Sequence, residues 1–270
     1  SKVAFFLSFL VKAIEGKGFL WYHLKEVINM KFEEVEALKE QLINKKKTMT
    51  KAKLQEICDE FDKRFIYEST SFENDDFTYE DVCFLLEDHS REFPDKKPYR
   101  RQAIINNYHA INMVHRLVEK GIQLNEATVK DLHQVLVEGI ITGGVYRTRD
   151  LFILGAKHVP PTYLKIFKKM DAYFQDLNDP ELKGLEKAAF AHLQLLKIYP
   201  FMDANGRLAR LLLNYQLELE GFLPVSITKE LRDDYFKNID EYKINKKIEP
   251  FTEFLANIEK ERIQEFLKRD

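Results

Sequence analysis

The stretch IYPFMDANGRLARLLLNYQL, from Ile198 to Leu217, decides how we interpret this chain. It contains a turn-prone Asp-Ala-Asn-Gly at residues 203–206, continues with two arginines three positions apart, and ends in a strongly apolar segment. The apolar positions of that segment follow a helical spacing of 3, 4, 7 and 11 residues: Leu208, Leu211, Leu212, Tyr215 and Leu219. The spacing predicts a buried helix that begins at the turn and ends near Gly221 and Pro224.

A buried helix has a fixed N-terminus, where free N–H groups and the helix dipole favour an anion. Arg207 and Arg210 fall in the first turn, where positive charge is unfavourable for the helix unless an anion or carboxylate neutralises it. Asp203 is a hard oxygen ligand suited to Mg²⁺ shared with phosphates. The pattern favours a diphosphate or triphosphate with a metal. A surface turn with solvated arginines is the alternative from the residues alone.

The overall composition is that of an ordinary globular protein. The chain has 270 residues, 45% hydrophobic and 32% charged, with a net charge of −2. This charge gives no reason to expect nucleic acid or an anionic membrane as a partner. Cys58 and Cys83 are the two cysteines, which excludes a disulfide framework and leads us to expect a cytoplasmic location. The apolar run from Val3 to Val11 is too short to span a bilayer.

Helical periodicity dominates the chain and predicts an all-α fold. The predicted helices cover 3–14, 20–44, 50–65, a segment starting at Thr78, 99–120, a segment from Asn125 or Thr128 to about 139, 162–176, 181–198, the helix of the opening stretch that ends near Gly221, 228–243 and 250–268. The exception is VYRTRDLFILGAKHV, residues 145–159, which favours a small β-hairpin. We divide the chain into an N-terminal helical extension (1–64), a short segment (65–75) and a main helical domain (76–270).

Residues 199–210 resemble the signature of the Fic family, His-Pro-Phe-x-Asp/Glu-Gly-Asn-Gly-Arg-x-x-Arg. This chain reads YPFMDANGRLAR, with Tyr199 in place of the histidine and Ala204 in place of the first glycine. The stretches AAFAHLQLLKIYPF, GGVYRTRDLFILGAKHVPP, NNYHAINMV and LRDDYFKNID resemble neighbouring parts of the family. The resemblance covers roughly residues 65–258 and implies a Fic-type helical domain with the hairpin as its flap.

The resemblance implies a transferase that moves AMP from ATP onto a hydroxyl of a target protein. It implies that Asp203 holds Mg²⁺, that Asn205 and Gly206 line the anion hole, and that Arg207 and Arg210 neutralise the phosphates. It makes Tyr235 a candidate to stack on adenine. The flap residues Phe152, Ile153 and Leu154 would pair with the target as an added strand. A homodimer is a further expectation from the family.

A second resemblance concerns autoinhibition. Some Fic proteins carry an inhibitory helix with the pattern Ser/Thr-x-x-x-Glu-Gly/Asn, and STSFEN, residues 69–74, is similar to it. Ser69 and Glu73 are four residues apart and would share one helix face. Glu73 could then form a bidentate ion pair with Arg210 and withhold that arginine from a phosphate. The alternative is a solvated glutamate at a helix end.

Tyr199 stands where the family has its general base. Tyrosine ordinarily titrates near 10 and histidine near 6.5, so tyrosine is the weaker base at neutral pH. His192 lies seven residues earlier, and we expect it to be a core residue rather than a substitute base. If the loop needs positive φ at Ala204, alanine costs roughly 1–2 kcal/mol relative to glycine.

Three interpretations follow. The first is a Fic-fold nucleotide-binding protein, autoinhibited by Glu73 and impaired or inactive in AMP transfer, which Tyr199 and the retained arginines favour. The second is an active enzyme with altered chemistry, including one that removes AMP with the help of Glu73. The third is a non-catalytic protein-interaction module that uses the flap.

Overall fold

The computed structural model describes residues 18–72, 76–153 and 157–269, with side chains from residue 32 onward. The helix predicted at 3–14 lies outside these ranges. The described residues contain helices and no β-strand, which confirms the all-α prediction. The helices are α2 (Gly18–Thr48), α3 (Lys51–Ser71), α4 (Tyr79–Glu87), α5 (Pro98–Glu119), α6 (Glu126–Leu136), η1 (Tyr163–Lys165), α7 (Ile166–Leu177), α8 (Gly184–Ile198), α9 (Asn205–Leu219), η2 (Lys229–Leu231), α10 (Arg232–Asn245) and α11 (Glu249–Leu267).

Polar side chains start several of these helices where the sequence predicts. The Thr78 hydroxyl accepts from the backbone N–H of Asp81, whose carboxylate accepts from the Thr78 N–H, so α4 begins with the expected capping box. Asn125 rather than Thr128 caps α6, because its side-chain oxygen accepts from the Thr128 N–H at 3.0 Å.

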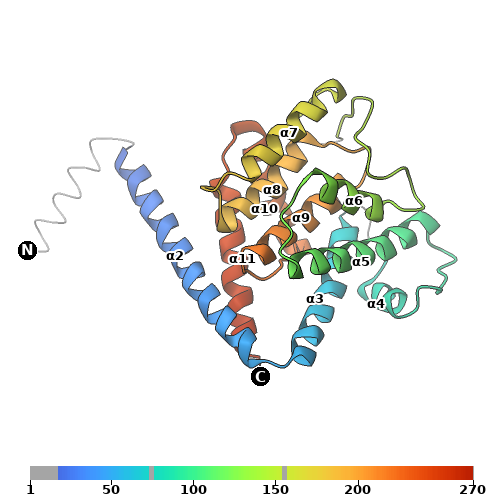
Figure 1. The fold of residues 1–270 in the computed structure, drawn as a ribbon, viewed down its shortest axis with the longest axis horizontal. Coiled ribbons are helices and arrows are strands. Elements are labelled where there is room, and N and C mark those ends of the chain that lie inside the picture. Colours follow the sequence, from blue (N-terminus) through green and yellow to red (C-terminus); the bar gives the residue numbers. More distant parts are fainter. Residues whose placement is uncertain (1–17, 73–75, 154–156, 270) are drawn as a thin grey trace, which may run out of the picture.

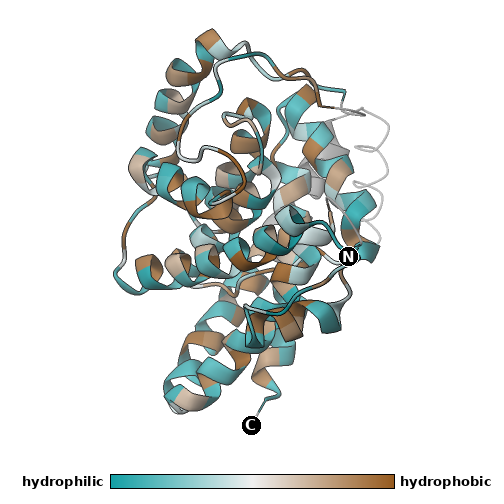
Figure 2. Ribbon diagram, turned by 90° about the vertical axis from the view of Figure 1, so that its right-hand side faces the viewer, coloured by the Kyte–Doolittle hydropathy of each residue, from teal (hydrophilic) through white to brown (hydrophobic). Residues whose placement is uncertain are grey.

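The helix predicted from the opening stretch lies at the centre of the fold (Figure 1). Twelve of the 15 residues of α9 are buried, and its main neighbour is α8. Leu208, Leu211, Leu212 and Tyr215 are each fully buried, as their spacing predicts. Helix α9 also contacts α3, α5 and α6. Its N-terminus is therefore held in place from several sides. In Figure 2, hydrophobic and hydrophilic segments alternate along many helices, as expected when one side of each helix is buried.

The N-terminal helices are tied to the main body at different places. Figure 1 shows α2 leaning away from the body toward its N-terminal end, while it packs against α11 nearer the C-terminus of the chain. Helix α3 contacts α4, α5 and α9, and it continues without a break across residue 65. Ser69 therefore lies in the last turn of a 21-residue helix. Among the described helices, none has a stretch long and apolar enough to cross a bilayer.

The β-hairpin predicted for residues 145–159 is wrong for the described part of that segment, because 145–153 and 157–159 form no strand. The backbone here bonds elsewhere: the Arg147 N–H donates to the Pro200 carbonyl at 2.9 Å. The Arg147 guanidinium donates to the carbonyl oxygens of Arg149 and Pro161, and so takes up acceptors that a partner strand would need. Contacts with residues 199–204, the signature loop between α8 and α9, outweigh the β-propensity of this segment. We keep the name flap for residues 145–159.

Glu259 on α11 makes the stability of the fold depend on pH. Its side chain is fully buried and accepts from the Leu223 N–H at 3.2 Å, and burial raises its pKa to about 8. The native chain then holds a proton that the unfolded chain releases above about pH 4.3. The free energy of unfolding should therefore fall as pH rises from 5 toward 8, by up to about 1.4 kcal/mol per unit from this group.

Urea denaturation of the wild type and of Glu259→Gln between about pH 5 and pH 8.5 measures this contribution. Glu259→Gln should reduce the fall of the free energy of unfolding between these pH values. Glu56→Gln, at a carboxylate that is 70% exposed, serves as the control and should leave the slope unchanged. An equal slope in the wild type and Glu259→Gln would show that Glu259 is ionised in the native state.

Candidate functional site

The loop between α8 and α9 is fixed by its own side chains and by two left-handed residues. Tyr199 ends α8 with φ 53°, and Ala204 precedes α9 with φ 58°. The side-chain oxygen of Asn205 accepts from the Phe201 N–H at 3.0 Å, and its amide donates to the Phe201 carbonyl at 2.9 Å. The fully buried Asn205 side chain thus clasps the loop, while its backbone opens α9.

The sequence left open whether the loop needs positive φ at Ala204, and the structure shows that it does. Asn205 and Gly206 are the first two residues of α9, and the left-handed position is Ala204, which is 2% exposed. A Cβ at positive φ costs roughly 1–2 kcal/mol. The packing of α8 against α9 therefore holds Ala204 in a conformation that its own side chain disfavours.

Replacing this alanine should stabilise the protein. Ala204→Gly should raise the free energy of unfolding by about 1 kcal/mol, because glycine adopts φ near +58° without a steric penalty. Ala209→Gly, inside α9, is the control, and it should lower the free energy of unfolding by about 1 kcal/mol or more, because Ala209 is also fully buried. Chemical denaturation of both variants decides the point. A lower free energy of unfolding in Ala204→Gly would contradict the claim that the backbone of Ala204 is strained.

His133 on α6 joins the loop to the start of the flap, and sequence reasoning missed it. The Gly144 N–H donates to its Nδ1 at 3.0 Å, so Nε2 carries the hydrogen and donates to the Asp203 carbonyl at 3.1 Å. Its ring stacks on Phe201 with the centroids 3.8 Å apart. Burial, with a contribution from Arg207, lowers its pKa to about 4, so the ring is neutral at pH 7. Within the apolar periodicity of α6, nothing marked this histidine as different from a core residue.

Arg147 is the second residue that the sequence did not single out. Its side chain is fully buried, and besides the carbonyls of Arg149 and Pro161 its Nε donates to the Tyr199 carbonyl at 2.9 Å. One guanidinium therefore joins the flap, and Pro161 just after it, to the residue that opens the signature. Its position within the expected hairpin hid this role, since alternate strand residues are usually exposed.

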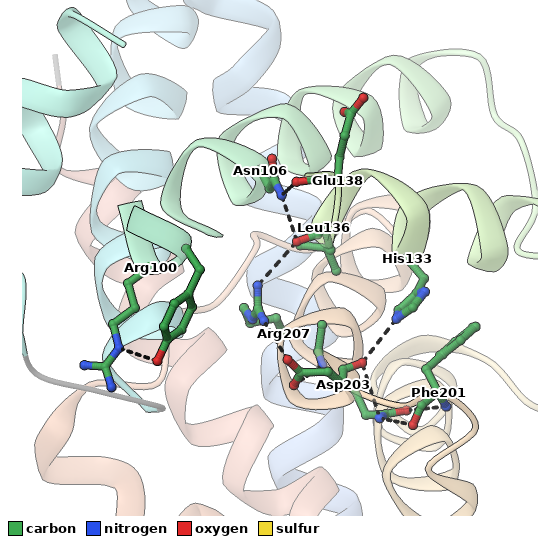
Figure 3. Close-up of polar contacts among 11 residues, drawn as sticks. Arg100, Asn106, His133, Leu136, Glu138, Phe201, Asp203 and Arg207 are labelled. Atoms are coloured by element: carbon green, nitrogen blue, oxygen red, sulfur yellow. Dashed lines mark hydrogen bonds and ion pairs between the residues drawn. The ribbon is translucent and has the colours of Figure 1, made fainter. Parts of the chain in front are cut away.

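Arg207 is buried at the C-terminal end of α6 (Figure 3). Its Nη1 donates to the Leu136 carbonyl at 3.4 Å, and its Nη2 lies 4.0 Å from the Asp203 carboxylate. Asn106 from α5 donates to the same Leu136 carbonyl at 3.2 Å and to the Glu138 carbonyl at 2.8 Å. The carbonyl end of α6 is a site of partial negative charge, so it stabilises the guanidinium.

Arg210 is buried against the last turn of α3. Its Nε donates to the Ser69 hydroxyl at 2.9 Å and its Nη2 donates to the Ser69 carbonyl at 2.8 Å. The guanidinium carbon lies 4.3 Å from the centre of the Phe72 ring. Both arginines at the start of α9 are thus neutralised in part by the carbonyl ends of neighbouring helices. The arginine on which the predicted autoinhibition depends is in contact with the segment predicted to inhibit it.

Asp203 borders a cavity of about 130 Å³ at the N-terminus of α9. The cavity is lined by Asp203 and Arg207 and by residues of α3, α5 and the segments beside them: Thr70, Ser71, Phe77, Tyr99, Arg100, Ala103, Ile104 and Ile140. The Asp203 side chain is 57% exposed, and no side chain caps α9. A carboxylate open to a cavity fits Mg²⁺ that takes its other oxygens from phosphates and water. The described residues hold no group of three or more metal-binding side chains, so a metal here needs such outside ligands.

Tyr235, the candidate for adenine stacking, lies in an aromatic cluster and is 1% exposed. Its hydroxyl pairs with His192 Nε2 at 3.0 Å, and Phe72 packs edge-on against its ring with the centroids 5.4 Å apart. In this conformation its ring faces are covered. The ring of the neighbouring Phe236 is 53% exposed. His192 is fully buried and burial lowers its pKa to about 3, so it is the core residue that we expected.

The remaining predicted site residues fall into two groups. Tyr199 is half-buried at the end of α8, while Phe152 is 84% exposed on the flap and Ile153 is half-buried. Leu154 and Glu73 lie outside the described residues. The structure therefore brings Tyr199, Asp203, Asn205, Gly206, Arg207, Arg210 and Ser69 together around the start of α9.

Comparisons with known proteins relate the chain to one family. Residues 123–217 match the Fic/DOC family. The chain is 30% identical over 208 residues to the protein adenylyltransferase Fic of Nematostella vectensis, a match that covers 75% of this chain and 48% of that protein. A second protein adenylyltransferase Fic, from Drosophila persimilis, is 30% identical over 154 residues, which cover 54% of this chain and 30% of that protein. The chain thus spans at most about half the length of these relatives.

Solved structures show the same fold. Fic-1 of C. elegans superimposes with a TM-score of 0.80 at 21% identity, covering 90% of this chain and 73% of that one. A Fic domain containing signaling protein from Bacteroides thetaiotaomicron gives a TM-score of 0.75 at 19% identity, covering 88% and 96%. With the signature loop at the start of α9, these matches show that the chain contains a Fic/DOC family domain with the Fic fold.

Proposed function

We propose that this chain binds ATP with Mg²⁺ at the N-terminus of α9, and that the site is built to transfer AMP to a hydroxyl of a target protein. The observation that carries the proposal is the exposed Asp203 carboxylate at a cavity beside the uncapped start of a buried helix. The backbone N–H groups of a helix start and its dipole favour phosphate. The relatives named protein adenylyltransferase supply the reaction class.

Each residue of the loop has a chemical task in this proposal. Asp203 would hold Mg²⁺, which neutralises phosphate charge and orients the leaving group. The backbone at Asn205 and Gly206 would line the anion hole, and Arg207 would add a fixed positive charge. Tyr199 would occupy the position from which a base removes the proton of the attacking hydroxyl.

Autoinhibition by the last turn of α3 is the second part of the proposal. Arg210 reaches a phosphate only by giving up its bonds to Ser69 and its contact with Phe72. Phe72 also covers Tyr235, so movement of this turn would expose an aromatic ring on which the adenine of ATP can stack. We propose that Glu73, which follows directly, strengthens the same restraint. ATP would then bind weakly or unproductively until the turn moves.

The metal requirement tests the site. We would titrate ATP into Glu73→Gly by calorimetry with and without Mg²⁺, and repeat both titrations with Glu73→Gly/Asp203→Ala. Mg²⁺ should tighten binding about tenfold or more in the first protein and have little effect in the second. Glu73→Gly/Asp150→Ala, which removes a half-exposed carboxylate of the flap, is the matched control. An ATP affinity that changes neither with Mg²⁺ nor with Asp203→Ala would contradict the proposed site.

A further inference from the structure

The flap and the start of α7 form one exposed surface whose side chains are apolar and basic. Large apolar side chains that are more than half exposed gather here: Val145 (53%), Phe152 (84%), Val159 (62%), Leu164 (77%) and Phe167 (70%). We call these residues and the charged ones between them the flap–α7 surface. The other exposed large apolar residues of the described chain are spread over several elements, among them Ile43, Phe84, Ile122 and Ile244. A concentration of this kind marks an interaction site more often than scattered residues do.

Three contacts join the two parts of this surface. The Phe167 ring packs edge-on against Tyr146 with the centroids 5.3 Å apart. The Tyr163 N–H donates to the Asp150 carboxylate at 2.7 Å, and the Arg147 guanidinium donates to the Pro161 carbonyl. Residues 145–150 of the flap are therefore held against the segment that leads into α7. Its exposed side chains and those of α7 can contact a single partner.

The charge of the surface selects the partner. The described exposed charged side chains of this surface are Arg149, Asp150, Lys157 and Lys165, and the exposed Lys168, Lys169 and Asp171 follow it on α7. Lys157 also lies 3.9 Å from Asp240 of α10. The chain as a whole has a net charge of −2, so this positive charge is local. Complementary charge favours an acidic partner and raises the rate of encounter. The exposed apolar side chains require apolar groups on that partner as well.

We propose that the flap–α7 surface docks an acidic protein segment with apolar side chains, and that Leu164 and Phe167 of the η1–α7 region are its anchors outside the flap. The inference rests on the proposed function in one respect, because it names the class of target that would be presented to the site. A protein is favoured over a lipid surface because Arg147 links this surface directly to the Tyr199 carbonyl. A segment held here is placed next to the signature loop.

A selection from a random peptide library tests the proposal with the whole chain as bait. Enriched peptides should be acidic and contain aromatic or aliphatic residues. Leu164→Ser/Phe167→Ser should weaken their binding about tenfold or more, as the loss of two anchors predicts. Phe84→Ser/Ile122→Ser removes exposed apolar groups elsewhere and should leave affinity unchanged. Raising NaCl from about 0.05 M to about 0.5 M should weaken binding severalfold.

Other results would overturn the proposal. Neutral or basic peptides, no enrichment, or binding that ignores Leu164→Ser/Phe167→Ser would each contradict it. Binding of the chain to phosphatidylserine vesicles that is lost in this variant, with no peptide enriched, would assign the surface to a membrane. ATP titration of the same variant separates the two proposals, since nucleotide affinity should equal that of the wild type. Peptide binding without any ATP binding would keep the docking surface and remove the transfer function.

Discussion

Replacing Tyr199 by histidine should raise AMP transfer by about 100-fold or more, the usual contribution of a positioned general base. We expect this in the Glu73→Gly background, where the proposed restraint on Arg210 is relieved. An imidazole is largely unprotonated at neutral pH and can accept the proton of the attacking hydroxyl, whereas a tyrosine hydroxyl is protonated. Transfer of label from α-phosphate-labelled ATP to protein, followed over time, measures the effect.

The backbone at this position should accept the substitution. The Tyr199 N–H donates to the Leu195 carbonyl at 2.7 Å, and its own carbonyl accepts from Arg147, so neighbouring residues set its left-handed conformation. Histidine is one of the residues that occur relatively often with positive φ. The new ring would therefore start from the same Cα–Cβ direction without added strain.

Tyr199→Phe in the same background is the control, and its labelling should equal that of the parent. If Tyr199→His leaves labelling unchanged although ATP still binds, another part of the site limits transfer. The proposed anion hole at Asn205 and Gly206 would be the first candidate, because Ala204 before it has a strained backbone.

His115→Ala should lower the free energy of unfolding by about 1–3 kcal/mol at pH 7, between the values for an exposed and a buried ion pair, because the His115 side chain is 28% exposed. His115 on α5 lies between two carboxylates, with Nε2 2.9 Å from Asp62 of α3 and Nδ1 3.5 Å from Glu218 of α9. Burial opposes its charge, but the hydrogen bonds to both carboxylates outweigh burial and raise its pKa to about 10. Alanine would leave two carboxylates facing each other without a cation.

Urea denaturation of the wild type and His115→Ala measures this loss. Glu56→Ala, which removes one partner of an exposed pair with Lys53 on the same helix α3, is the control and should cost less than about 1 kcal/mol. The stabilisation by His115 is complete below its ordinary pKa near 6.5 and is lost as pH rises through about 10. The difference between wild type and variant should therefore shrink from pH 7 toward pH 10. A difference that grows over this range would contradict a protonated His115.

The sequence predicted most helices because their signals are local. The apolar spacing of α9 and the caps at Thr78 and Asn125 depend on residues within one or two turns, and each was confirmed. The predicted β-hairpin of the flap was wrong because the conformation of this segment depends on a hydrogen bond between Arg147 and the Pro200 carbonyl, which are 53 residues apart. The strand propensity of neighbouring residues contains no information about such a long-range contact.

The site shows the same division. The signature pattern marked Asp203, Asn205 and the two arginines as a group, and the structure gathers them at the start of α9. It did not reveal that the Asn205 side chain clasps the loop, or that His133 and Arg147 connect the loop to the flap. The roles of His133 and Arg147 come from other elements, and histidine and arginine are equally common in ordinary cores and surfaces. The clasp by Asn205 depends on which backbone groups its amide reaches, which the residue type alone does not show.

The most direct test of the account is calorimetric titration of ATP with Mg²⁺ into the wild type, Glu73→Gly and Glu73→Gly/Arg210→Ala. We predict weak binding to the wild type, at least about tenfold tighter binding to Glu73→Gly, and loss of that gain with Arg210→Ala, because a charge-assisted bond to phosphate is worth more than about 1.4 kcal/mol. Equal affinity in wild type and Glu73→Gly would contradict the autoinhibition. Absence of binding in all three proteins would contradict the nucleotide site itself.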